Sequence, residues 1–446
     1  MMCQFQPFMF LLLMQLKLLK AEGRCIFVEV QQRCICSLLN QSELKNIAVC
    51  LLAAEYELKG GNLEQFAGFS GMKPSSNIID ILQALQVRKL IFTDLFVPEI
   101  LLPSALEFIS HTRLVSELEF VNCTFLRPVH WQYTRSLNLK VTSLRFHKVI
   151  AAPLDERFDI YNLKRWLETL ENLTLTESQV ASIPCKIGRL FRALQFLDIS
   201  GNNFQDQSIN STFCKGVFPQ LQVLKLNHNN LTSYETLCKT LSNFDTLTHL
   251  DLSQNYFLPG VLPFRCMWPQ SLQIFNLSDT GLERMDRLLP PNIKVLDLSA
   301  NNIFTLDFSH SALKELYLSN NRLQTFPSVH QLPNLEILNL DGNCMSRLQS
   351  KNLLYLKHLQ SLKAGHNPYN CSCTYYIKEI QDLAVKESLL LDWPQNYVCE
   401  SPPIYQGYLV KDVPLSLLYC NKTLISQGSV VNLLMCLSLV LHLLLA

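Results

Sequence analysis

The chain carries no excess charge of either sign and none of the short motifs that mark common enzyme classes. Its 38 Lys and Arg residues nearly balance 37 Asp and Glu residues, giving a net charge of +1, so no bulk field draws it to nucleic acid. The sequence contains no glycine-rich phosphate loop, no H-E-x-x-H zinc motif and no G-x-S-x-G nucleophile motif. We therefore predict a protein that is not an enzyme, with no cofactor and no metal.

The sequence instead contains a repeat of 20 to 29 residues. Residues 293–303 read apolar-x-x-Leu-x-Leu-x-x-Asn-x-apolar, the leucine-rich-repeat signature. Leu296 and Leu298 point to one side of a short strand, and Asn301 turns the chain and bonds neighbouring backbone. About 12 units begin at Val87, Val115, Val141, Leu170, Leu194, Leu221, Leu247, Leu272, Ile293, Leu313, Leu335 and Leu359. Such units bury their apolar faces only by stacking, which predicts a solenoid.

The Asn position identifies the register of the repeats. It is held by asparagine at Asn202, Asn229, Asn255, Asn301, Asn321, Asn343 and Asn367. Cys123 and Thr280 occupy it once each, whereas Leu95, Val149 and Ser178 are poor matches, so the register is firm from the fifth repeat onward. We expect a leucine-rich-repeat solenoid, a curved horseshoe with parallel strands on the concave face and loops and short helices on the convex face.

Both ends of the chain are apolar and predict a secreted, membrane-attached protein. Residues 1–23 fit a signal peptide, which together with 16 cysteines indicates an oxidising compartment. Residues 421–446 combine a polar spacer with an apolar tail, the pattern of a glycosylphosphatidylinositol (GPI) anchor signal; a short membrane span is the alternative. The candidate attachment residues are Asn421, Ser426 and Gly428. We expect the extracellular face of the plasma membrane, with a soluble secreted form as a second location.

Eight Asn-x-Ser/Thr sequons agree with secretion. They stand at Asn40, Asn122, Asn172, Asn210, Asn230, Asn276, Asn370 and Asn421. Asn276 lies between two apolar strand residues, so we expect it to face outward, where a glycan would cover part of the concave surface.

Cysteines predict disulfide-stapled caps around the repeats at 87–369. In the N-terminal region, 24–86, four cysteines allow three connectivities, of which Cys25–Cys36 with Cys34–Cys50 is favoured. Zinc is the competing interpretation, but a C-x-C spacing suits the usual zinc fingers poorly. Cysteines one repeat apart lie on adjacent coils, which favours Cys185–Cys214 and Cys238–Cys266.

The cysteines of residues 370–420 resemble the C-terminal cap of extracellular leucine-rich-repeat proteins. That resemblance implies the pairs Cys371–Cys399 and Cys373–Cys420. With Cys3 and Cys436 set aside, Cys123 is interpreted as a buried turn residue and Cys344 as a free thiol.

Apolar side chains accumulate where the repeats begin. Tyr56 and Leu58 alternate with Glu55 and Glu57, which predicts a half-buried strand ended by Gly60-Gly61. The apolar excess is either the core of the cap or a pocket between the cap and the first repeats. The pocket would be lined by Tyr56, Leu58, Leu63, Phe66, Phe69, Leu82, Leu85, Val87, Leu90, Phe92, Val97, Ile100 and Leu101.

Charged residues near this region and along the repeats have two interpretations each. The basic residues beside the apolar region are ordinary solvated charges or phosphate contacts: Lys59, Lys73, Arg88 and Lys89. Asp198, Asp251 and Asp297 form a column that is the ordinary polar face of the repeats or a site for a basic partner.

Several motifs, most of them N-terminal, resemble one family closely. Cys34-Ile-Cys36, Gly61-Asn-Leu-Glu-Gln-Phe66, Leu85-Gln-Val-Arg-Lys-Leu90 and Arg265-Cys-Met-Trp268 resemble the monocyte differentiation antigen family, over roughly residues 24–345. That family supplies the lipopolysaccharide co-receptor of Toll-like receptor signalling. The repeats after Asn343 and the C-terminal cysteine cap depart from it and look more like the ends of Toll-like receptors.

The resemblance implies a pattern-recognition co-receptor in innate immune and inflammatory signalling. It would take the acyl chains of lipopolysaccharide and other acylated microbial lipids into an N-terminal apolar pocket, receive them from a carrier protein, and pass them to a Toll-like receptor with its lipid-binding accessory protein. The sequence leaves open whether the protein forms a homodimer. The alternative is a GPI-anchored adhesion or signalling protein that binds a protein on its concave face. A Toll-like receptor proper is disfavoured, because no cytoplasmic domain follows the apolar tail.

Overall fold

The chain forms two compact units, residues 1–230 and 231–446, in a computed structural model. The structure describes residues 24–37, 50, 52–63, 74–98, 101–126, 139–150, 163–258, 266–285, 289–306, 308–328, 331–353, 355–385, 388–418 and 420. The predicted signal peptide, the predicted anchor signal and the sequon residue Asn40 lie outside these residues. Within them, every helix is too short or too polar to span a bilayer.

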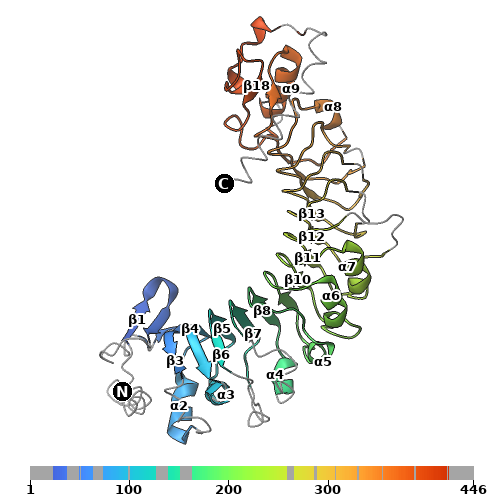
Figure 1. Cartoon of the computed structure of the whole chain (residues 1–446). Helices are drawn as coiled ribbons and strands as arrows, with labels where there is room; N and C mark the ends of the chain where they lie inside the picture. The colour runs from blue at the N-terminus through green and yellow to red at the C-terminus, as the bar shows by residue number, and fades with distance from the viewer. Residues whose placement is uncertain are drawn as a thin grey trace. The chain divides into compact units, whose positions relative to one another are not determined.

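The first unit is built on a sheet whose strands follow one another along the chain (Figure 1). The strands are β1 (Arg24–Val28), β2 (Arg33–Ser37), β3 (Glu55–Asn62), β4 (Lys89–Pro98), β5 (Glu117–Val121), β6 (Thr124–Leu126), β7 (Ser143–His147), β8 (Asn172–Thr176), β9 (Phe196–Asp198) and β10 (Val223–Lys225). β1 pairs with β2 in antiparallel fashion, and each later neighbour in the sheet is parallel. β6 pairs with the end of β4.

Short helices return the chain from one strand of the first unit to the next. They are α2 (Ser76–Ala84), α3 (Leu101–Ser110), α4 (Lys164–Leu167), α5 (Cys185–Gly188) and α6 (Asp206–Thr212), with a 3-10 turn, η1 (Glu29–Gln31), between β1 and β2. In the coils that contain α2 to α6 the helix follows the strand, which is the order that the repeat predicts.

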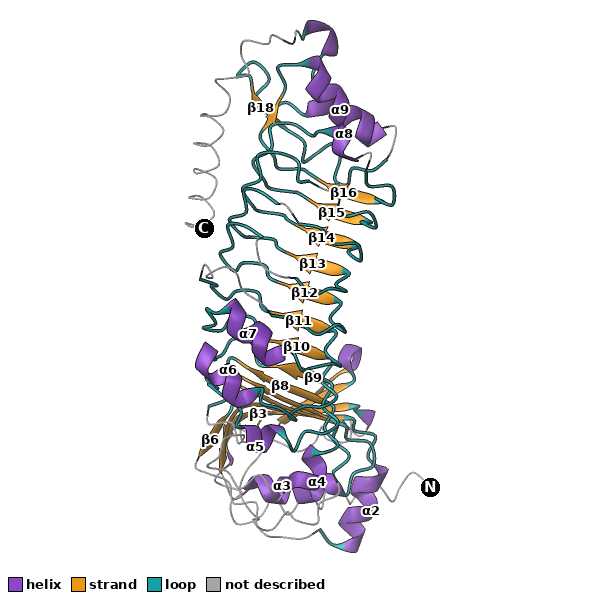
Figure 2. Cartoon of the chain, turned by 90° about the vertical axis from the view of Figure 1, so that its right-hand side faces the viewer, coloured by secondary structure: helices purple, strands orange, loops and turns teal. Residues whose placement is uncertain are grey.

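The second unit repeats the same architecture with shorter strands (Figure 2). Parallel strands β11 (His249–Asp251), β12 (Ile274–Asn276), β13 (Val295–Asp297), β14 (Glu315–Tyr317), β15 (Ile337–Asn339) and β16 (Ser361–Lys363) follow α7 (Tyr234–Leu241). The unit ends in α8 (Ser350–Leu353), β17 (Tyr369–Asn370), α9 (Thr374–Val385), β18 (Cys399–Ser401), η6 (Val410–Asp412) and η7 (Leu415–Leu417). The predicted leucine-rich-repeat solenoid is confirmed.

Alternation along each strand decides which residues form the core. In β13, Leu296 is fully buried while its neighbours Val295 and Asp297 are half-exposed. β12 has the same pattern, so Asn276 faces outward beside the buried Phe275, as predicted. The core is therefore a continuous row of leucine and phenylalanine side chains behind each sheet.

The asparagine that recurs in the repeats has a direct role in hydrogen bonding. The Asn301 Nδ2 group donates to the carbonyls of Leu277 and Leu298 at 2.9 and 3.0 Å, and its Oδ1 accepts from the backbone N–H groups of Thr280 and Leu282, both at 3.0 Å. All seven repeat asparagines are buried. The predicted role of the asparagine, bonding neighbouring repeats, is confirmed.

Three shorter side chains form hydrogen bonds with the backbone at repeat positions where asparagine is missing. Cys123 is buried, and its Sγ lies 3.3 Å from the Phe92 carbonyl, which confirms it as a buried turn residue. The Ser178 Oγ accepts from the Val149 N–H at 3.0 Å. Ser178, a poor match to the sequence pattern, therefore replaces asparagine as a hydrogen-bond acceptor for the backbone. The Thr280 Oγ1 donates to the Leu277 carbonyl at 2.7 Å. The repeat is thus regular well before the fifth unit.

Six disulfides join described cysteines to one another. They are the six predicted pairs, Cys25–Cys36, Cys34–Cys50, Cys185–Cys214, Cys238–Cys266, Cys371–Cys399 and Cys373–Cys420, and all are confirmed. The prediction that Cys344 is a free thiol is wrong, because Cys344 is disulfide-bonded.

Candidate functional site

Two apolar columns run along the inner face of the first unit. Parallel register places Cys34, Tyr56, Leu90, Leu118, Leu144 and Leu173 in one column and Cys36, Leu58, Phe92, Phe120, Phe146 and Leu175 in the other. The rings of Phe92 and Phe120 stack with centroids 4.8 Å apart, and those of Phe120 and Phe146 stack at 5.2 Å. The stacked rings hold β4, β5 and β7 in one register.

Burial within these columns changes abruptly near the start of the chain. Leu118 and Phe120 on β5 are only 2% and 3% exposed. Their equivalents Leu58 on β3, and Leu90 and Phe92 on β4, are only half-buried. Covering exposed apolar surface yields about 25 cal/mol per Å2. The first coils therefore keep apolar surface that a ligand could cover.

Tyr56 ties this region to the N-terminal cap. Its ring packs against the buried cluster of Cys25, Cys34, Cys50 and Ala53, and its hydroxyl donates to the Cys50 carbonyl at 2.5 Å. Burial raises the pKa of Tyr56 to about 12, so the phenol is neutral at physiological pH. Tyr56 thus belongs partly to the cap core and partly to the half-buried inner face.

The other predicted lining residues divide into three groups. Leu82, Val87 and Val97 are buried. Leu63, Leu85 and Leu101 are half-buried. Phe66, Phe69 and Ile100 lie outside the described residues. The structure thus brings part of the predicted set together on β3, β4 and the start of α3, and the pocket itself stays a prediction.

An exposed apolar row near this region was not predicted from the sequence. Asn62, Phe96, Thr124 and Ile150 are neighbours on successive coils, and the two apolar members are 51% and 57% exposed. The left-handed backbone of Asp94, with φ of 56°, interrupts the alternation of β4 and turns Phe96 outward. The signal in the sequence is this single aspartate between the apolar runs Leu90–Phe92 and Leu95–Val97 of the strand.

Two glycines redirect the neighbouring strand instead of ending it. β3 was predicted to end at Gly60-Gly61, but it continues to Asn62. Gly60 and Gly61 have φ of 73° and 116°, which glycine adopts at little cost. The strand therefore bends and goes on pairing with β4.

The outward face of the first strands carries a ladder of ion pairs. Arg33 contacts Glu55 at 2.7 Å, and Glu119 contacts Lys89 at 2.7 Å and Arg145 at 3.2 Å. Since Glu119 is buried beneath these partners, the ladder is part of the folded structure.

The basic residues predicted to contact phosphate differ in their exposure and in their ion pairs. Lys59 and Arg88 are exposed, and Lys73 lies outside the described residues. Lys89 lies on the outward face, opposite the apolar columns, in the ion pair with Glu119. Lys89 would have to break its ion pair with Glu119 before it could contact a phosphate.

The aspartate column on the strands has a local structural role. The Oδ1 atom of Asp198 accepts from the N–H and the hydroxyl of Ser200, and Asp251 makes the same two bonds with Ser253. Asp297 accepts from the Ser299 N–H at 2.8 Å. These bonds favour the interpretation of the column as the ordinary polar face of the repeats.

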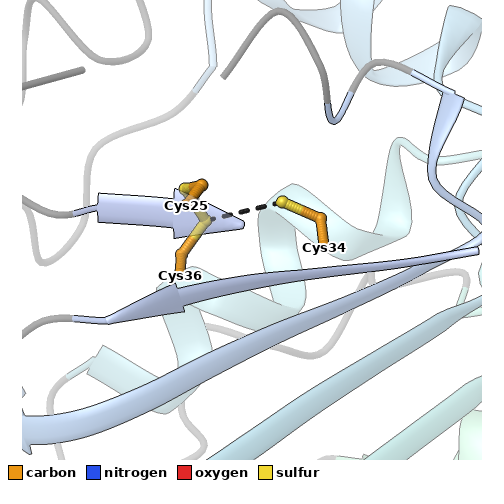
Figure 3. A group of neighbouring side chains, drawn as sticks. All are labelled: Cys25, Cys34 and Cys36. Carbon is orange, nitrogen blue, oxygen red and sulfur yellow. Dashed lines mark hydrogen bonds between the residues drawn. A yellow bond between two sulfur atoms is a disulfide. The ribbon is translucent and has the colours of Figure 1, made fainter. Parts of the chain in front are cut away.

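The N-terminal cap contains a cluster of three sulfur atoms (Figure 3). The sulfurs of Cys25, Cys34 and Cys36 lie within 4.8 Å of one another. All three belong to disulfides, Cys25–Cys36 and Cys34–Cys50. Metal ligation by cysteine requires a thiolate, so this donor set does not fit a metal ion.

The described sequon residues differ in accessibility. Asn122, Asn210 and Asn230 are exposed. Asn172, Asn276 and Asn370 are half-exposed, each on a strand. Asn421 lies outside the described residues. Glycosylation at these positions stays a prediction.

Comparison with family models identifies the repeat. The model described as "Leucine Rich repeats (2 copies)" matches residues 311–353, and "Leucine Rich Repeat" matches residues 193–215. These segments contain β14, β15 and β9, and they share the strand and asparagine pattern described above.

Comparison with curated proteins finds Toll-like receptors. The chain is 32% identical to Toll-like receptor 2 type-2 of Gallus gallus over 344 residues, which is 76% of this chain and 43% of that protein. It is 30% identical to Toll-like receptor 2 of Homo sapiens over 348 residues, 77% of this chain and 44% of that protein. The aligned part is less than half the length of these relatives.

Solved structures share the fold at lower sequence identity. The mouse RP105/MD-1 complex contains a chain with a TM-score of 0.53 and 17% identity, covering 82% of this chain and 67% of that chain. The TLR13-ssRNA13 complex gives a TM-score of 0.53 and 17% identity, covering 81% and 61%. The chain is thus a leucine-rich-repeat protein related to the Toll-like receptors.

Proposed function

We propose that this chain is a cell-surface, receptor-like protein that binds acylated microbial lipids, lipopolysaccharide first among them, and transfers them to a Toll-like receptor complex. The observation that carries the proposal is the half-buried apolar surface of Leu58, Leu90 and Phe92 in columns whose members from β5 to β8 are buried. Acyl chains laid on such a surface gain burial free energy without any chemical step.

The disulfides and the relatives support an extracellular setting for this function. Six disulfides in the described residues fit an oxidising compartment. The mouse RP105/MD-1 complex contains a chain of the same fold together with a second protein. This supports the proposal that the present chain acts in a complex with an accessory protein. Attachment by a GPI anchor and delivery of lipid by a carrier protein are part of the proposal. They follow from the sequence pattern at 421–446 and from the family resemblance.

A second candidate function is adhesion or signalling through a protein ligand on the strand face. The half-exposed side chains of Ile274 on β12, Val295 on β13 and Ile337 on β15 favour it, because they place apolar surface on the outward side of the second unit. A glycan at Asn276 would lie within this surface.

Binding of fluorescent lipopolysaccharide to cells that express the full chain separates the two candidates. The double variant Leu58→Asn/Leu90→Asn introduces polar groups into the half-buried columns and should lower saturable binding at least tenfold. The matched control Ile274→Asn/Ile337→Asn makes the same kind of change on the strand face and should leave lipid binding within twofold. Equal surface expression of both variants, measured with an antibody to an epitope tag, shows that the protein folds.

The reverse pattern would favour the second candidate. If the columns tolerate the change and the strand-face variant alone loses binding to receptor-bearing cells, lipid transfer is not the function.

A further inference from the structure

A cationic surface covers the helical side of three successive coils in the first unit. It consists of Lys164, Arg165, Lys186, Arg189, Arg192 and Lys215, all of them exposed. They lie on α4, on and just after α5, and after α6, helices that follow one another in Figure 1. None of these residues belongs to the apolar columns or to the outward ion-pair ladder.

Repeat register brings the members of this surface together. Arg165 and Arg189 each stand five residues before the first leucine of the following repeat, and Lys215 stands six before it. Equivalent positions on consecutive coils are neighbours. The Cys185–Cys214 disulfide, with Cα atoms 6.0 Å apart, fastens α5 to the loop that carries Lys215.

Side-chain contacts agree with this arrangement. The Arg189 Nη2 atom lies 3.8 Å from the Cys214 Sγ atom. The Arg192 Nε atom lies 3.3 Å from the Glu168 Oε1 atom, so α4 and the end of the α5 coil meet at this point. The cationic surface is therefore one continuous strip.

Positive charge predominates on this strip among the described residues. Glu168 and Asp206 are the carboxylates that α4 to α6 contribute beside the six cations, and Glu168 is shared between Arg192 and Lys164. This concentration contrasts with the near-neutral composition of the chain. A local field of this sign attracts anions even though the whole molecule has almost no net charge.

The lack of apolar side chains on the strip indicates the kind of anion. Between Ile150 and Tyr256, no large apolar side chain in the described part of the chain is exposed. Proteins that lie on anionic membranes combine cations with apolar groups that enter the lipid. A strip with cations alone fits a linear, fully hydrated polyanion better than it fits a bilayer.

We propose that this cationic surface binds a linear sulfated polysaccharide of the cell surface or matrix. Sulfate groups spaced along the chain would contact arginine and lysine on three successive coils, with release of counterions. This site is independent of the proposed lipid function, because it lies on the helical side and shares no residue with the apolar columns.

Heparin serves as the probe for this proposal. The full chain, purified from cells that express it, should bind heparin at about 0.15 M salt with an affinity that falls as salt rises. The triple variant Arg165→Gln/Arg189→Gln/Lys215→Gln should bind at least tenfold more weakly. The control Lys294→Gln/Lys357→Gln/Lys411→Gln removes the same charge from exposed positions of the second unit and should stay within twofold.

Several results would overturn the proposal. Equal loss in both triple variants would mean that only net charge matters, and unchanged binding in the first would place heparin elsewhere. Stronger competition by single-stranded DNA or by phosphatidylserine vesicles than by heparan sulfate would replace the polysaccharide with a nucleic acid or a membrane. Thermal unfolding checks that the variants fold. If the triple variant does not fold, the single Arg165→Glu variant should still lower heparin affinity at least threefold.

Discussion

At the scale of single residues, the repeat asparagines show how one side chain holds two coils together. Asn301 satisfies two backbone carbonyls and two backbone N–H groups that are buried between strands. A leucine-rich coil buries these polar groups whether or not a partner is present, and each orphaned group costs about 1–3 kcal/mol. The asparagine position is therefore a stability determinant and not a binding site.

Asn301→Ala should lower the free energy of unfolding by about 3 kcal/mol, because the alanine leaves several buried backbone groups without partners. Chemical denaturation of wild type and variant measures the change. Asn302→Ala, on the half-buried neighbour, should cost less than about 1 kcal/mol. Similar losses in the two variants would mean that the asparagine bonds contribute nothing specific.

Tyr56, on β3 of the first unit, makes the stability of the protein depend on pH. Burial raises its pKa from 10.0 to about 12, so the folded state keeps the phenol proton in a range where the unfolded state loses it. The stabilising contribution is complete below pH 10 and is lost as pH rises from 10 to 12. Titration of tyrosinate absorbance should show a class near pH 12 that diminishes in Tyr56→Phe. An identical titration curve in the variant would contradict the assigned burial.

At the scale of elements, a left-handed residue before each asparagine position sets the turn of the coil. It recurs in poorly matching repeats as well as in good ones, at Asp94, Asn122, Lys148, Glu177, Gly201, His228, Gln254, Asp279, Ala300, Asn320, Gly342 and His366. Each of these residues other than Gly201 and Gly342 carries a local backbone cost, because a side chain disfavours the left-handed region.

Ala300→Gly should therefore stabilise the second unit by up to about 1 kcal/mol, because Ala300 is exposed with φ of 55° and glycine relieves the strain. Ala300→Val should destabilise it by more than 1 kcal/mol, since a β-branched side chain is poorly tolerated there. Differential scanning calorimetry measures both. A valine variant as stable as wild type would show that the turn is not strained.

The same turn explains what the sequence could and could not predict about the fold. The L-x-L pattern predicted the strands correctly because side-chain alternation fixes the core face. The one-repeat spacing of cysteines predicted Cys185–Cys214 and Cys238–Cys266 because such residues lie on adjacent coils, whereas the two C-terminal pairs came from the resemblance to extracellular caps. Ser178 was misjudged because a hydroxyl can bond the backbone as asparagine does. Phe96 was missed because the left-handed Asp94 interrupts the alternation that sequence reasoning assumes.

The candidate site was only partly predictable. Tyr56, Leu58, Leu90 and Phe92 were placed correctly on one face by alternation. Their incomplete burial depends on which neighbours cover them, and a pattern of apolar letters does not contain that information. The opposite orientation of Lys89 follows from strand parity, but its pairing with Glu119 depends on the adjacent coil.

At the scale of the whole molecule, the surfaces proposed for lipid, polysaccharide and protein ligands are separate. The apolar columns begin at the N-terminal coils, the cationic surface lies on the helical side of the first unit, and the strand face of the second unit carries an outward sequon. The similarity to Toll-like receptors supports the proposed receptor role, in which lipid transfer is the central claim.

Photo-crosslinking tests that claim most directly. A lipid A analogue with a photoreactive group at the end of an acyl chain is bound to the full chain, irradiated with and without excess lipid A, and mapped by peptide mass spectrometry. We predict competed cross-links in the peptides that contain β3 and β4, residues 55–62 and 89–98. Saturable binding with cross-links confined to the second unit, or no competed cross-link at all, would contradict the account.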